Sequence, residues 1–179
     1  MTLDNDNKAL VKLLNDYKSE VLKYSDADFN YKKSAEIWSI GQMYEHLTLS
    51  AGYFFLKNIK YCLEQRNGQM GGDMNSNGEN VFKYNSFPPI KVKVPGNAPE
   101  PIAKAQKYYA EELEKIIQQV ERQFIDVEEN DGSYKTQHPV FGWHNAQQWL
   151  HSFEMHHRHH LRQKAELEAY ILEEKNNLN

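Results

Sequence analysis

Residues 149–163 read Trp149-Leu150-His151-Ser152-Phe153-Glu154-Met155-His156-His157-Arg158-His159-His160-Leu161-Arg162-Gln163. On a helical wheel at about 100° per residue, Trp149, Phe153 and Leu167 fall within about 40° of one another. His156 and His160 lie in the middle of this apolar stripe, at about 340° and about 20°. The segment therefore predicts a long amphipathic helix that points two imidazoles toward the protein interior.

Two histidines one helical turn apart can share a metal ion. His156 and His160 are four residues apart, so a helix places them on one face, and neutral imidazoles at that spacing suit a transition metal. A polar core layer or a histidine-rich surface would explain the pair without a metal. On the wheel His157 and His159 flank the stripe at about 80° and about 280°, and His151, at about 200°, faces away.

A third candidate ligand lies earlier in the chain. The helical neighbours of His46 are Gln42, Met43, Leu47 and Ser50, which indicate an interior face that also carries some polar side chains. Alone it could be an ordinary core histidine, but with the helix pair it favours a three-nitrogen site, the open arrangement of catalytic metals. Side chains that could orient these imidazoles are Gln42, Glu45, Tyr53, His159 and Gln163. The sequence identifies no separate catalytic residue.

Periodic apolar residues predict four helices in all, at residues 6–24, 39–65, 99–122 and 145–174. The second and fourth open on capping boxes, with Gln42 three residues after Ser39 and Gln148 three residues after Asn145. Pro99 and Pro101 suit the first turn of the third. No strand-rich region is evident. Four long helices predict an all-α fold, a four-helix bundle.

The connections between these helices differ in length. Residues 25–33 form a short one, whereas residues 66–97 carry five Gly- or Pro-containing breaks and are unusually long for a compact domain. The long segment is a helix 2 to helix 3 crossover, a lid over a site, or both, and residues 91–94 could be a short extended piece. A loop, 138–142, leads into the last helix; we expect His138 and His144, in and after it, to be structural or exposed.

The amino-acid composition limits the classes of function that the chain can have. The 179 residues fit a single domain spanning 1–179. With 21 basic and 25 acidic residues, net charge −4, the chain has no electrostatic footprint for nucleic acid, and no segment suits a membrane. A lone cysteine, Cys62, and an N-terminus without signal-peptide character predict a cytoplasmic protein. The expected partner is a small-molecule substrate.

Two stretches together resemble the DinB-like superfamily of metal-binding four-helix bundles. The first is Trp38-Ser39-Ile40-Gly41-Gln42-Met43-Tyr44-Glu45-His46-Leu47, with a histidine eight residues after the tryptophan. The second joins His138-Pro139-Val140-Phe141-Gly142 to the run from His156 to Gln163, which is similar to the H-P-x-F-G loop and the H-x-x-H-H-x-x-Q signature of one branch. Both occur in the family's order and on the expected helices.

This resemblance implies a bundle whose long crossover makes helices two and three parallel. It also implies a divalent metal held by His46, His156 and His160, often in a homodimer. Characterised members include transferases and isomerases that use low-molecular-weight thiols, and some hydrolases. The long Asn/Gly-rich connection and the extra histidines are departures from the family's pattern, so the substrate class is not carried over.

Three functions are compatible with these observations. The first is a metal-dependent thiol S-transferase or hydrolase that acts on a small electrophile, with Zn(II) or Ni(II) as the foremost metals and a low-molecular-weight thiol as a candidate cofactor. The second is a non-catalytic metal-binding protein of stress response or interaction. The third is a metal-free helical interaction module whose histidines are only core or surface polar groups.

Overall fold

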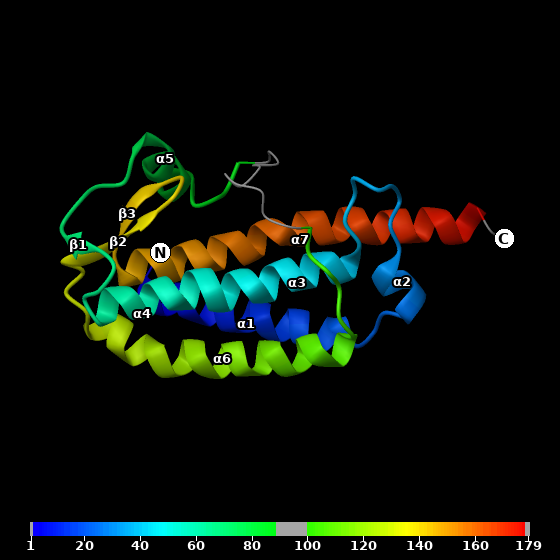
Figure 1. The fold of residues 1–179 in the computed structure, drawn as a ribbon, viewed down its shortest axis with the longest axis horizontal. Helices are drawn as coiled ribbons and strands as arrows, with labels where there is room; N and C mark the ends of the chain where they lie inside the picture. Colours follow the sequence, from blue (N-terminus) through cyan, green and yellow to red (C-terminus); the bar gives the residue numbers. More distant parts are fainter. Residues whose placement is uncertain (1, 89–99, 178–179) are drawn as a thin grey trace.

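The computed structural model describes residues 2–88 and 100–177. Among these residues, four long helical segments lie side by side and confirm the all-α class (Figure 1). They are α1 (Leu3–Val21), the continuous α3 (Ile40–Ser50), η1 (Ala51–Leu56) and α4 (Lys57–Leu63), then α6 (Gln106–Glu129) and α7 (Ala146–Asn177). Two short helices, α2 (Asp26–Asn30) and α5 (Ser76–Tyr84), lie between them.

The long helices enclose one apolar core. α1 and α3 each pack against both α6 and α7. Along the colour gradient of Figure 1, α3–α4 and α6 run toward the end that carries the strands, while α1 and α7 run away from it. The largest fully buried side chains are aromatic, among them Trp149, Tyr17, Tyr44, Tyr109 and Phe153. In the described parts of the chain, no helix has an apolar stretch long enough to cross a membrane.

Two helix starts are fixed by the predicted capping boxes. The Gln42 amide N–H donates to Ser39 Oγ at 3.1 Å, and the Ser39 amide N–H donates to Gln42 Oε1 at 3.0 Å. Asn145 and Gln148 exchange the equivalent bonds at 2.8 and 2.9 Å. These contacts satisfy backbone N–H groups that have no partner within a helix, so both starts lie where the sequence places them.

The third long helix differs most from its prediction. It starts at Gln106 rather than 99 and ends at Glu129 rather than 122. Residues 100–105 are not helical, because the Gln42 amide donates to Glu100 Oε1 and to the Pro101 carbonyl, both at 2.9 Å, and holds this segment against α3. Smaller differences are the α1 bounds, three residues earlier at each end, and α2 within the expected connection at 25–33.

A small sheet, absent from the prediction, caps one end of the bundle. Its strands are β1 (Gln69–Met70), β2 (Tyr134–His138) and β3 (Gly142–His144), antiparallel in the order β1-β2-β3. Strands of two to five residues are too short to show an alternating pattern in the sequence. The predicted connection at 66–97 thus contains β1 and α5. The extended piece at 91–94 lies outside the described residues, as does the rest of the connection from residue 89 to residue 97.

Candidate metal centre

Three histidines from two helices meet inside the bundle. His46 of α3 and His156 and His160 of α7 each offer one ring nitrogen, and these atoms all lie within 4.8 Å of one another. The Nε2 atoms of His46 and His156 are 3.3 Å apart. Within residues 2–88 and 100–177, no cysteine, carboxylate or fourth histidine joins the group. The structure therefore brings together the three residues singled out in the sequence.

A π-helical segment sets how the second helical segment faces α7. Nine residues separate His46 from Phe55, so an uninterrupted α-helix would place them about 180° apart. The extra residue in the π turn of η1 removes about 100° of that rotation. Both rings consequently face α7 and pack on His156, with ring centroids 5.2 Å away for His46 and 5.1 Å for Phe55.

The electrostatics of the cluster keep its imidazoles neutral. Burial lowers the pKa of His46 to about 4. Burial, and then the neighbouring His46, lower the pKa of His160 to about 3. Burial also lowers the pKa of His156 far below its ordinary value, with the other histidines adding to the effect. All three rings are therefore unprotonated at neutral pH, and neutral imidazole is the form that binds a metal.

The residues present fit a divalent transition metal. Three neutral nitrogen donors converge from one side, and imidazole suits Zn, Ni, Cu and Fe. Three protein ligands leave coordination positions for other molecules, as in catalytic sites. A cluster of neutral histidines could hold such an ion without first releasing protons to solvent.

Two of the five predicted orienting residues lie beside the cluster. Gln163 Oε1 accepts a hydrogen bond from Nδ1 of His160 at 2.7 Å, which leaves Nε2 of that ring for the cluster. His159 packs edge-on against His160, with ring centroids 5.6 Å apart. Gln163 lies three residues from His160 on α7, a spacing at which helical side chains are neighbours, whereas His159 adjoins His160 in the sequence.

The other three predicted orienting residues are engaged elsewhere. Gln42 caps α3 and binds residues 100–101, as described above. Glu45 is buried and accepts hydrogen bonds from Lys104 Nζ and the Tyr109 hydroxyl, both at 3.0 Å. Tyr53 is 75% exposed on η1. Within the described structure, none of the three is hydrogen-bonded to a histidine of the cluster.

The histidines outside the cluster are more enclosed than the wheel indicates. His157 is fully buried, and its carbonyl accepts a hydrogen bond from the Tyr17 hydroxyl at 3.0 Å. His151 lies 3.0 Å from an Asp6 carboxylate oxygen and packs on Phe82 of α5. The wheel assumes one buried face, whereas α7 is contacted by α1, by η1 and, through Phe82, by α5.

The loop histidines support the strand pair next to α7. His138 Nδ1 accepts hydrogen bonds from the backbone N–H groups of Val140 and Phe141, at 3.1 and 3.2 Å. His144 is fully buried and stacks on His138, with ring centroids 5.4 Å apart. Both are structural, which is one of the two expectations from the sequence, and neither belongs to the three-histidine cluster.

Besides Phe55, two further aromatic side chains beside the cluster were not predicted from the sequence. Trp38, just before α3, packs on His46 with ring centroids 5.4 Å apart. Phe87, after α5, lies 6.2 Å from the His156 ring and 6.0 Å from the His159 ring. Trp38 belongs to the Trp-Ser motif that begins the second helix, but that motif does not show that the Trp38 ring packs on the His46 ring. Phe87 carries no local sequence signal.

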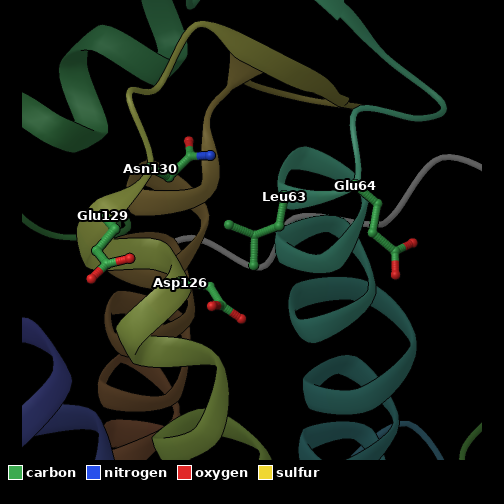
Figure 2. A pocket seen from close by; sticks show the side chains of 5 residues that line it. All are labelled: Leu63, Glu64, Asp126, Glu129 and Asn130. Atoms are coloured by element: carbon green, nitrogen blue, oxygen red, sulfur yellow. The ribbon is translucent and has the colours of Figure 1, made fainter.

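A separate cavity of about 390 Å³ lies between the C-terminal ends of α4 and α6. It is lined by Leu63, Glu64, Asp126, Glu129 and Asn130. Figure 2 shows that the Glu64 carboxylate points away from Asp126, so the acidic groups do not converge on one point. None of the predicted site residues lines this cavity, and the three-histidine cluster remains the candidate functional site.

Comparison with known families agrees with this geometry. The family model described as the DinB superfamily matches residues 3–163, which include every residue of the cluster and Gln163. A search of curated proteins finds no match. Because the family match covers most of the chain, the protein belongs to the DinB superfamily.

Proposed function

We propose that this protein is a metal-dependent enzyme, a thiol S-transferase or hydrolase that acts on a small electrophile. His46, His156 and His160 would be the metal ligands, with Zn(II) or Ni(II) as the foremost ions. The observation that carries the proposal is the convergence of three neutral ring nitrogens within 4.8 Å. Membership of a superfamily of metal-binding proteins supports it.

The metal would supply a Lewis acid, so that water or a thiol could act as a nucleophile at neutral pH. The chain's own residues prepare the site. Gln163 holds the His160 proton on Nδ1 and so keeps the Nε2 lone pair available. Phe55 supports the His156 ring from within the core, while Trp38 and Phe87 exclude water from parts of the cluster.

The two reaction classes differ in the nucleophile. In a transferase, a low-molecular-weight thiolate forms a sulfur–carbon bond to the electrophile, and the leaving group departs with its bonding electrons. In a hydrolase, a water oxygen forms a bond to the electrophilic carbon, the bond to the leaving group breaks with its electron pair, and a water proton passes to solvent or to the leaving group. A site with open positions beside three protein ligands accommodates either nucleophile.

Metal content of purified variants tests the ligand set. After chelation and reloading with Zn(II), we expect wild-type protein to hold stoichiometric zinc by mass spectrometry. His46→Ala, His156→Ala and His160→Ala should each lose most of it. His151→Ala is the matched control, because His151 is on the same helix but lies against Asp6 and Phe82, outside the cluster, and it should retain zinc. Stoichiometric zinc in the three ligand variants would contradict the proposal.

Turnover separates the enzyme from a non-catalytic metal protein. The reloaded protein is incubated with a chromogenic haloarene and a panel of small thiols, and in parallel with ester and amide substrates in the absence of thiol. We expect product from one series, with loss of activity on chelation and recovery on reloading. Bound metal without turnover in either series would favour the non-catalytic alternative.

A further inference from the structure

Among the described residues, the three histidines have only uncharged partners. These partners are one another, aromatic rings, neighbouring histidines and the Gln163 amide. Glu45 is adjacent to His46 in the sequence, but its carboxylate is directed to Lys104 and Tyr109. The cluster thus has neutral ligands in neutral surroundings.

The outer nitrogens of the α7 ligands also lack a carboxylate partner. Nδ1 of His160 bonds to an amide, and Nδ1 of His156 is buried with no hydrogen-bond partner among the described residues. In many metal sites a carboxylate behind the imidazole supplies negative charge. Here a divalent ion would keep its full charge in a half-buried place, where a counter-charge would stabilise it. An anionic donor from a ligand would provide one.

Aromatic rings flank the same cluster. Trp38 packs on His46, and Phe87 packs on His156 and His159; both are partly exposed, so they can also meet a bound molecule. The segment that carries Phe87 is anchored to α7. Arg158 Nη2 donates to the carbonyl of Asn85, two residues before Phe87, at 3.0 Å and to the Asn85 side-chain oxygen at 3.3 Å. Planar groups pack well against such rings.

We propose that the centre selects a planar, apolar molecule bearing one anionic donor group, such as an aromatic carboxylate, thiolate or hydroxamate. The donor group would neutralise part of the metal charge, and the planar body would lie against Trp38 and Phe87. This assignment rests on the proposed function, because the donor group needs a metal to bind. It adds the chemical class of the ligand.

Three probes test the anionic donor and the planar ring separately in zinc-loaded protein. Benzohydroxamate carries both the anionic donor and the ring, acetohydroxamate only the donor, and benzamide only the ring. By isothermal titration calorimetry we expect benzohydroxamate to bind about tenfold or more tightly than acetohydroxamate, and benzamide to bind far more weakly than either. This comparison uses unaltered protein, so it does not depend on the folding of any variant.

Leucine variants assign the ring preference to the two aromatic residues. Trp38→Leu and Phe87→Leu keep apolar bulk but remove planarity, and in the double variant the tenfold preference should shrink to about threefold or less. Zinc content should stay stoichiometric. Tyr84→Leu is the control, since Tyr84 is 69% exposed on α5, and it should keep the wild-type preference.

The outcomes distinguish this inference from the proposed function. Equal affinities for the two hydroxamates, tight binding of benzamide, or an unchanged preference in the double leucine variant would overturn the ligand assignment alone, provided that zinc binds. Failure of the wild-type protein to hold zinc would overturn the proposed function, and the ligand assignment with it.

Discussion

Gln163 accepts a hydrogen bond from Nδ1 of His160 at 2.7 Å, which turns the other ring nitrogen of His160 toward His46 and His156. The contact fixes both the tautomer and the orientation of one candidate ligand. Among the described residues, it is also the only hydrogen bond between a side chain outside the cluster and a histidine within it.

Gln163→Leu should therefore weaken metal binding about tenfold or more, because the His160 ring loses the acceptor that orients it. Gln163→Glu keeps an acceptor, adds negative charge and should bind metal at least as tightly as wild type. Competition with a chromogenic chelator measures both affinities, and circular dichroism checks that both variants fold. Equal zinc affinity in the leucine variant and wild type would show that the contact does not orient a ligand.

Stability should depend on pH through His138. Burial, with His144 nearby, lowers its folded-state pKa to about 3, whereas an unfolded histidine titrates near about 6.5. Between these values the unfolded chain binds the extra proton and the folded chain does not. The free energy of unfolding should thus fall as pH drops from about 6.5 toward about 3, by up to ~1.4 kcal/mol per pH unit from this residue.

His138→Asn supplies the matched comparison. An asparagine side-chain oxygen can accept from the Val140 and Phe141 N–H groups in place of Nδ1, but it does not titrate. Urea denaturation at several pH values between 6 and 4 should show a pH slope that is shallower by about 1.4 kcal/mol per unit. Parallel slopes for the two proteins would mean that His138 is protonated at a similar pH in both states.

Two glycines of the second helical segment should respond oppositely to alanine. A Cβ at Gly41 would lie 2.7 Å from Ala103 Cβ and 2.8 Å from Phe29 Cε1, whereas a Cβ at Gly52 meets nothing within 4 Å. Gly41→Ala should destabilise the protein by roughly 1–3 kcal/mol through overpacking. Gly52→Ala should stabilise it by about 0.5–1 kcal/mol, since it reduces the freedom of the unfolded chain. Urea denaturation measures both, and a change of the same sign in both would contradict the packing described.

The register set by η1 can be tested by deletion of Tyr53. Removing one residue from the π turn would restore a regular α-helix but rotate residues 54–63 by about 100° relative to His46. We expect a loss of more than about 3 kcal/mol of stability and loss of zinc binding. Tyr53→Ala preserves the register and should cost less than about 0.5 kcal/mol, because that side chain is mostly exposed. Comparable stability of the two variants would show that the register is not set here.

The parts of the fold that were predictable are those with a repeating pattern. The apolar stripe of α7 and the capping residues Ser39 and Asn145 are local signals, and both helix starts were predicted from them. The π turn was not predictable, because its extra residue rotates the later positions by about 100° without interrupting the run of mostly apolar residues from Ala51 to Leu56. Its effect is visible only once α7 is in place.

In the candidate site, too, local spacing was predictable and contacts between distant segments were not. Helical spacing placed His156 and His160 together, and the resemblance to a family supported His46 as the third member. The burial of His157 depends on α1, which supplies Tyr17, and could not be deduced from one helix. Phe87 reaches the cluster through the fold of α5, since residues distant in sequence determine its place.

Phe87 and Glu100 hold the two described ends of the crossover. Phe87 packs on His156, and Glu100 is bound by Gln42, one helical turn before His46. A peptide joining these two anchors would start beside His156 and finish one helical turn from His46 along α3, whatever its length. Protein engineers could therefore exchange the connection between the two anchors while the bundle that presents the imidazoles remains untouched.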